Sequence, residues 1–139
     1  MQFSIDNHTE YLPNIELLEQ ITKNYTDKDI ELIICENEYI CQLNHEFRDK
    51  NKATDVLSFP YDDMPMTPLG SIVISVDFVK AKSKEFHHTV DEEFTLLFIH
   101  GLLHLLGYDH EIDNGEQREE EQKIIQKFNL PHSLIIRNQ

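Results

Sequence analysis

The sequence predicts an α+β fold in one domain, residues 1–139, with a mixed four-stranded sheet packed on helices. The chain has 139 residues, of which 40% are hydrophobic and 27% charged, which is typical of a single globular core. Strand and helix patterns alternate in the first half of the chain, whereas the second half shows helical patterns only. This order of patterns predicts an α+β chain.

The first half begins with two strand–helix units. Residues 3–5 alternate apolar and polar side chains, as in a short strand, and a helical apolar pattern follows Pro13. Residues 30–35 form a β-branched run that suits a buried strand, and a second helical pattern then ends near Arg48. We therefore expect strand, helix, strand, helix.

Two further strands are predicted at residues 56–59 and 69–75, joined by a loop at 61–68 that contains two prolines. Helices separate the first three strands of the chain, so we expect these three to be parallel with right-handed crossovers. A loop alone joins the last two strands, so one strand should run antiparallel. A mixed sheet results.

The second half predicts helices at about 76–86, 90–106 and 115–128. Thr89 and Glu92 have the spacing of a capping box, which would start the second of these helices. That helix has almost no polar face, so it should lie buried at the centre of the fold. Any polar side chain within it therefore needs an explanation.

Three histidines near the end of this helix predict a metal site. His100 and His104 are four residues apart and share one helix face, and Gly107 could turn the chain so that His110 approaches them. The stretch H-G-L-L-H-L-L-G-Y-D-H has the histidine and glycine spacing of the metzincin zinc motif. We predict one Zn²⁺ ion held by three imidazoles, with water in the fourth position. A purely structural zinc site is the alternative.

A peptidase is disfavoured because the sequence lacks two of its features. Gly101 stands where the H-E-x-x-H motif has the glutamate that acts as general base. The methionine turn is also missing, since every methionine precedes the histidines. Cys35 and Cys41 are interpreted as small buried residues, reduced in a cytosolic protein.

The charge balance limits contact with nucleic acid. The chain has 12 Lys and Arg residues against 26 Asp and Glu residues, for a formal charge of −14, so any such contact must be local. No segment is apolar enough to predict a membrane span, and we expect a cytoplasmic protein. Some of the basic residues form two clusters: Arg48, Lys50 and Lys52, and Lys80, Lys82 and Lys84. The second cluster is also explained as ordinary solvated surface.

Three blocks of sequence carry a family resemblance. They are L-N-H-E-F-R-D-K-N-K-A-T-D-V-L-S-F-P at 43–60, L-G-S-I-V-I-S at 69–75, and the three-histidine stretch. In this order they closely resemble the YbeY family of bacterial rRNA maturation factors, over most of the chain after Leu43. Ser71 departs from the family, which usually has Asp at that position.

The resemblance implies a zincin-like α+β domain whose central buried helix binds zinc through His100, His104 and His110. It implies a single-strand-specific endoribonuclease that acts in small-subunit rRNA 3′-end maturation and in ribosome quality control. Arg48 and His100 are the expected catalytic residues, and His100 is at the same time a metal ligand. The expected partners are single-stranded RNA, small-subunit rRNA, the small ribosomal subunit and its assembly factors, with no DNA and no membrane. The nucleophile stays open between water and the RNA's own 2′-hydroxyl.

A second function is a ribosome-assembly factor whose metal site is mainly structural and which has little nuclease activity. Three polar residues, Asp55, Ser58 and Asp109, could each accept a hydrogen bond from a ligand imidazole. The acidic run 119–121 is interpreted as a solvated helix face supported by Lys123, and the histidines at 87 and 88 as loop residues.

Overall fold

The computed structural model describes residues 1–48, 55–62, 64–109 and 112–130, without the side chain of Arg48. The elements follow the expected order, and the predicted α+β class is confirmed. They are β1 (Phe3–Asn7), α1 (Ile15–Lys23), β2 (Ile30–Cys35), α2 (Asn37–Arg48), β3 (Val56–Pro60), β4 (Gly70–Ser75), α3 (Val76–Glu85), α4 (Val90–Leu105) and α5 (Glu116–Lys127).

The four strands form one mixed sheet in the order β1-β2-β4-β3. β1 and β2 are parallel, β2 and β4 are parallel, and β3 is antiparallel to β4. The expectation that the first three strands are parallel was therefore wrong, because the antiparallel strand is β3. Every residue of β4 is buried, which suits an interior strand. β3 ends at Pro60, which has no N–H to donate and is tolerated at a sheet edge.

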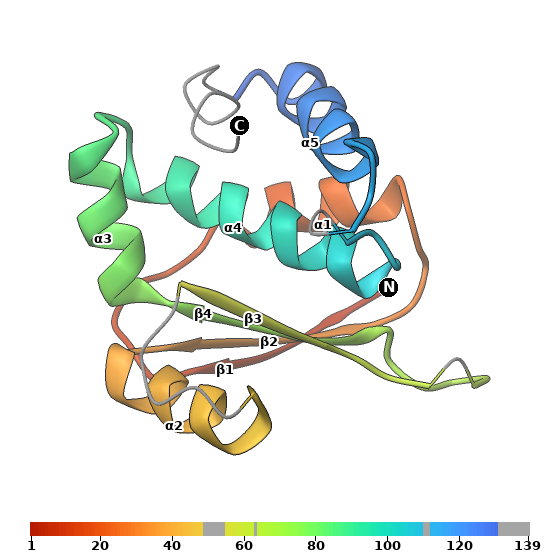
Figure 1. Ribbon diagram of the computed structural model, residues 1–139, viewed down its shortest axis with the longest axis horizontal. Helices are drawn as coiled ribbons and strands as arrows, with labels where there is room; N and C mark the ends of the chain where they lie inside the picture. The colour runs from red at the N-terminus through yellow and green to blue at the C-terminus, as the bar shows by residue number, and fades with distance from the viewer. Residues whose placement is uncertain (49–54, 63, 110–111, 131–139) are drawn as a thin grey trace.

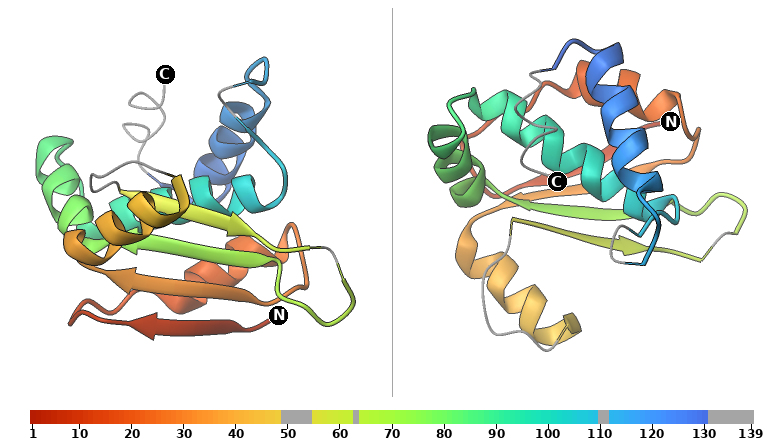
Figure 2. Two further views of the ribbon diagram at one scale, coloured as in Figure 1. Left: turned by 60° about the horizontal axis from the view of Figure 1, so that its bottom comes forward. Right: turned by 45° about the horizontal axis from the view of Figure 1, so that its top comes forward.

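The helices cover the two faces of the sheet unequally. Figures 1 and 2 show α4 lying across one face, with α1 beside it and α5 outside it, while α2 lies on the opposite face. α4 packs against β3, β4, α1, α3 and α5. It is therefore the central helix of the fold, as the sequence predicted.

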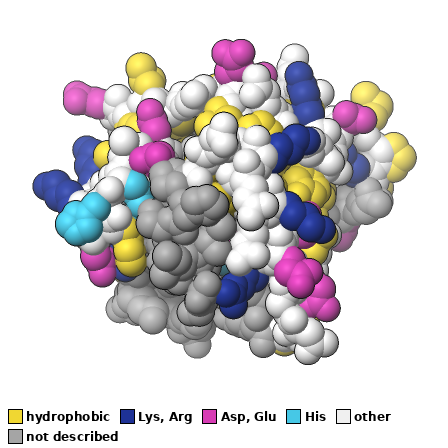
Figure 3. Space-filling model, turned by 90° about the horizontal axis from the view of Figure 1, so that it is seen from above, with side chains coloured by type: hydrophobic (Ala, Val, Ile, Leu, Met, Phe, Trp, Pro, Cys, Tyr) yellow, Lys and Arg dark blue, Asp and Glu magenta, His cyan; other side chains and the backbone are white. Residues whose placement is uncertain are grey.

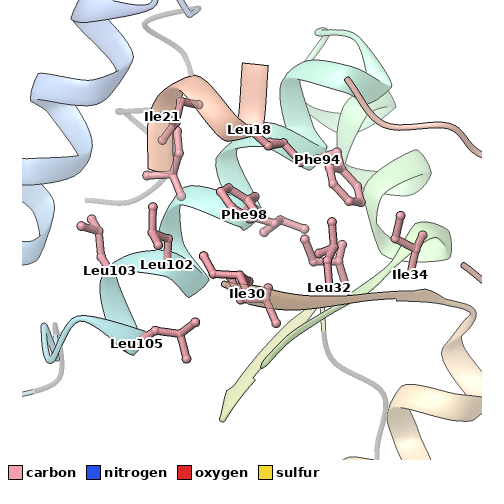
Figure 4. Packing of buried hydrophobic residues seen from close by; sticks show 14 of the residues in the cluster. Leu18, Ile21, Ile30, Leu32, Ile34, Phe94, Phe98, Leu102, Leu103 and Leu105 are labelled. Atoms are coloured by element: carbon pink, nitrogen blue, oxygen red, sulfur yellow. The ribbon is translucent and has the colours of Figure 1, made fainter. Parts of the chain in front are cut away.

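The main core lies between α4 and the sheet. Alternate residues of β2 point toward α4, where they meet side chains from α1 and α4 (Figure 4). Its members include Leu18, Ile21, Ile30, Leu32, Ile34, Phe94, Phe98, Leu102, Leu103 and Leu105. Burial of this apolar surface holds α4 in place, which in turn positions any side chain that α4 presents.

A smaller cluster on the other face holds α2 against the sheet. It contains Cys35, Ile40, Leu57 and Val73. Burial raises the pKa of the Cys35 thiol to about 12, so this cysteine is a protonated, unreactive core residue. Cys35 is buried, as expected, whereas Cys41 is only partly buried. Within the described ranges, no helix has the length and apolar character that a membrane crossing requires.

Candidate functional site

The start of α4 is set by the predicted capping box. The Thr89 side chain accepts a hydrogen bond from the Glu92 backbone N at 3.1 Å, and Glu92 Oε1 accepts one from the Thr89 backbone N at 2.8 Å. Two backbone donors that the first turn leaves without helical partners are satisfied in this way. The cap fixes where the helix begins and therefore which residues share a face.

One face of α4 carries His100 and His104. Their ring centroids lie 5.0 Å apart, and the ring planes are inclined by 72°. The His100 side chain is 25% exposed, so the pair is not sealed inside the core. The structure thus brings together two of the three predicted metal ligands on the second half of α4, where the other residues are apolar and almost all buried.

The end of α4 turns at Gly107, as predicted. Gly107 has φ of 102°, a left-handed conformation that glycine adopts without a Cβ clash. The Tyr108 backbone N donates to the Leu103 carbonyl at 3.0 Å, and the Gly107 backbone N donates to the His104 carbonyl at 3.0 Å. This pair of bonds is the Schellman motif that ends helices. His110, the predicted third ligand, lies outside the described residues.

Gly101, the residue after His100 in α4, is packed against the sheet. A Cβ atom at this position would lie 3.0 Å from Ile72 Cγ2 and 3.5 Å from Val56 Cγ2. The position that holds glutamate in H-E-x-x-H peptidases is therefore part of the packing contact between α4 and the sheet in this protein. A glutamate side chain at this point would have to displace apolar side chains of β3 and β4.

The described partner of the His100 ring comes from α5. Glu121 Oε1 lies 2.7 Å from His100 Nδ1, and the Glu121 side chain is only 5% exposed. Gln117, one turn earlier on α5 and fully buried, places Nε2 3.3 Å from the same ring nitrogen and 3.5 Å from the His100 carbonyl oxygen. The interpretation of 119–121 as a solvated face was therefore wrong for Glu121. Lys123 pairs with Glu120, at 3.1 Å.

A sequence signal for Glu121 existed in the spacing of α5. The buried residues of this helix are Gln117, Glu121, Ile124 and Ile125, which follow the i, i+4, i+7, i+8 pattern of a core-facing stripe. Two of the four stripe positions are polar. A buried polar side chain requires a partner, so the stripe, and not the acidic run, was the informative pattern.

A second buried histidine–glutamate pair lies near the start of α4. His88 occupies the loop before the helix, as expected, but its side chain is only 2% exposed. His88 Nε2 lies 2.7 Å from Glu93 Oε1, and the Glu93 side chain is fully buried. Glu93 and His100 are seven residues apart on α4, about 10 Å along the axis. This pair is therefore separate from the site at the end of the helix.

The other predicted site residues lie outside α4. α2 lies on the sheet face opposite to α4 (Figure 2), and Arg48 is its last residue, with a side chain outside the described part of the chain. Lys50 and Lys52 are outside it as well. Asp55 Oδ1 accepts a hydrogen bond from the Val56 backbone N at 2.8 Å, and the Asp109 carbonyl accepts one from the Ile112 backbone N at 3.2 Å in a turn.

Comparisons with known proteins identify the family. The family model described as "Endoribonuclease YbeY" matches residues 4–129. Curated proteins named "Endoribonuclease YbeY" are similar over nearly the whole chain. The protein from Nautilia profundicola is 60% identical and that from Sulfurimonas denitrificans 58% identical, each over 134 residues that cover 96% of this chain and 96% of the relative. The protein from Campylobacter jejuni strain RM1221 is 50% identical over 88% of this chain and 91% of its own length.

A solved structure shares the fold. The solution structure of TM1509 from Thermotoga maritima matches with a TM-score of 0.61 and 27% sequence identity, over 95% of this chain and 88% of that one. The family match covers far more than half of the sequence, and the relatives align over almost all of it. The chain therefore belongs to the Endoribonuclease YbeY family.

Proposed function

We propose that this protein is a zinc-dependent endoribonuclease that cleaves single-stranded RNA in small-subunit rRNA 3′-end maturation and in ribosome quality control. Its relatives are named endoribonucleases, which supports an RNA substrate and a hydrolytic reaction. The ribosomal part of the proposal rests on the resemblance of the motifs at 43–60, 69–75 and 100–110. Its setting is the cytoplasm, with the small ribosomal subunit and its assembly factors as partners.

The observation that carries the proposal is the His100–His104 pair on α4. The donor set suits zinc, because neutral imidazole is a preferred zinc ligand and two histidines four residues apart can share one ion. His110 is the proposed third ligand, and the arrangement would be zincin-like. When bound, zinc supplies a Lewis acid that polarises a phosphoryl oxygen.

The protein's own residues have separate roles in this proposal. His100 and His104 hold the ion on a helix that the core keeps rigid. Arg48 contacts the phosphodiester, because its planar guanidinium can hold two non-bridging oxygens and stabilise charge that develops in the transition state. Gly101 offers no carboxylate, so none of the chemistry is assigned to a base at that position.

The exposure of His100 favours an enzyme over a structural metal site. A structural zinc site is usually closed by four protein ligands, whereas a catalytic site keeps one position open to solvent. The His100 side chain is 25% exposed, so solvent reaches the histidine pair, as a catalytic site requires. The packing of Gly101 against Ile72 speaks against a peptidase.

The test is cleavage of a single-stranded RNA by purified protein, with and without a chelator, beside a His104→Ala variant prepared in the same way. We expect cleavage by the wild type only, restored by Zn²⁺ after chelation. His100→Ala and His110→Ala should also lose most bound zinc. Cleavage that survives both the chelator and the His104→Ala change would contradict the metal-dependent reaction. Stoichiometric zinc without cleavage would favour the assembly-factor alternative.

A further inference from the structure

We infer that Glu121 is a positioning residue for His100: its carboxylate holds the imidazole in the tautomer that leaves Nε2 free to bind a metal ion. The inference rests on the proposed zinc site. It assigns a role to a residue on α5, a helix separate from the one that carries the histidine pair (Figure 1). Two observations support this role, the geometry of the contact and the burial of Glu121, and a second histidine–glutamate pair in the same chain provides a control.

The contact between Glu121 and His100 determines the tautomer. An ionised carboxylate can only accept hydrogen bonds, so at 2.7 Å from Glu121 Oε1 the His100 Nδ1 atom must carry the hydrogen. In a neutral imidazole the lone pair is then on Nε2. A metal-bound histidine is commonly oriented by this kind of bond from its second nitrogen.

Gln117 cannot replace Glu121 in this role. Nδ1 cannot donate to Glu121 and accept from the Gln117 amide at the same time. The contact to Glu121 is 2.7 Å and that to Gln117 is 3.3 Å. The shorter, charge-assisted contact therefore determines that His100 Nδ1 carries the hydrogen. The Gln117 amide then points toward the His100 carbonyl oxygen, 3.5 Å away.

The burial of Glu121 indicates that packing alone does not explain it. α5 packs into the core through Ile124 and Ile125, and an apolar side chain at 121 would extend that stripe. Burying a carboxylate is costly unless it is well paired. Here the cost is offset by a bond to the one His100 nitrogen that a metal would not use.

The chain provides its own control in the pair of His88 and Glu93. This pair has the same nitrogen–oxygen distance, 2.7 Å, and a fully buried carboxylate, but its histidine is not a proposed ligand. A Glu93→Gln variant therefore removes a comparable buried charge from α4 itself. It separates a general loss of stability from a loss of metal positioning.

The experiment measures zinc affinity by competition with a chelator for the full chain and for Glu121→Leu, Glu121→Gln and Glu93→Gln. Glu121→Leu removes the acceptor, and zinc affinity should fall about 10- to 100-fold, the range found when such partners of metal ligands are removed. Glu121→Gln can keep an acceptor oxygen and should restore part of the affinity. Glu93→Gln should bind zinc as the wild type does.

A second measurement does not need the metal. ¹⁵N chemical shifts of His100 in the zinc-free protein should show hydrogen on Nδ1, and Glu121→Leu should shift the ring toward a mixture of tautomers. Hydrogen on Nε2 in the wild type would overturn the inference even if Glu121→Leu fails to fold. Zinc affinity of Glu121→Leu within twofold of the wild type would overturn the inference and leave the proposed metal site standing. No zinc binding by the wild type would overturn the metal site, and the inference with it.

Discussion

Gly101 lies where α4 touches the sheet, and a Cβ atom at this position would make a tight contact with side chains of the sheet. A Cβ atom there would be 3.0 Å from Ile72 Cγ2, a contact that a small movement of Ile72 could relieve. A glutamate would in addition bring a charge among buried apolar groups without a described partner. This glycine therefore serves packing, while His100 and His104 on the same helix are the proposed metal ligands.

We predict that Gly101→Glu lowers the free energy of unfolding by at least about 3 kcal/mol, because overpacking and an uncompensated buried charge add together. The variant should gain no peptidase activity. Gly101→Ala is the control: the helix gains about 1 kcal/mol from alanine and loses a similar amount from the contact with Ile72, so its stability should stay near the wild type. Urea unfolding measures the free energy of unfolding of both variants. A Gly101→Glu protein as stable as the wild type would refute the packing argument.

At the scale of elements, α5 is tied to the turn after α1 by a hydrogen bond that involves a charge. The Tyr25 hydroxyl donates to Glu120 Oε2 at 2.9 Å, and Lys123 donates to the other oxygen at 3.1 Å. The bond from Tyr25, with a smaller effect of Lys123, lowers the pKa of Glu120. α5 must be held in place for Glu121 to reach His100, so this bond supports the site from a distance.

We predict that Tyr25→Phe raises the pKa of Glu120 toward its ordinary value and lowers stability at neutral pH by about 1 kcal/mol. A carboxylate with a lowered pKa stabilises the fold above its ordinary pKa, and this contribution is lost as the pH falls through the folded-state value. The difference between variant and wild type should therefore shrink below about pH 4. NMR titration and urea unfolding across pH measure the two effects. Tyr61→Phe, which removes a similar bond to Glu31, is the control and should leave the pKa of Glu120 unchanged.

At the scale of the whole molecule, the formal charge of −14 opposes RNA binding. Figure 3 shows one face of the protein, on which the acidic and basic side chains of the described residues are interspersed and form no broad basic area. RNA must therefore be held locally, and the basic segment of Arg48, Lys50 and Lys52 is the proposed place. The second basic cluster belongs to α3, at the end of the fold away from the C-terminus of α4 (Figure 1).

We predict that neutralising Lys50 and Lys52 weakens RNA binding and flattens its salt dependence, with a slope smaller by about 0.7 for each RNA phosphate that is no longer neutralised. Arg48→Ala should mainly slow cleavage, by about 10²-fold or more, as expected for a transition-state donor. Neutralising Lys80 and Lys84 removes the same charge from α3 and should change neither RNA binding nor the rate of cleavage. Binding curves at several salt concentrations and single-turnover cleavage rates distinguish these effects. An Arg48→Ala protein that cleaves at the wild-type rate would show that Arg48 is not catalytic.

The sequence by itself determined the local features of this protein. The start of α4 follows from Thr89 and Glu92, its end from Gly107, and the shared face of His100 and His104 from the helical repeat. Each of these depends on residues within a few positions of one another, so short-range spacing is sufficient to predict them. The family resemblance also rested on short segments, 43–60, 69–75 and the three-histidine stretch, and was confirmed.

Only the tertiary structure decided the features that depend on residues distant in sequence. Periodicity identifies a strand but not its neighbour, so the antiparallel edge position of β3 emerged from pairing with β4 and from the burial of β4 on both faces. The bond between Glu121 and His100 joins residues 21 positions apart on different helices. In the sequence Glu121 is one of three consecutive acidic residues. It differs from the other two because the packing of α5 on α4 points its side chain toward the interior of the protein. The desolvation of a buried carboxylate then makes a partner necessary, and the fold supplies the imidazole.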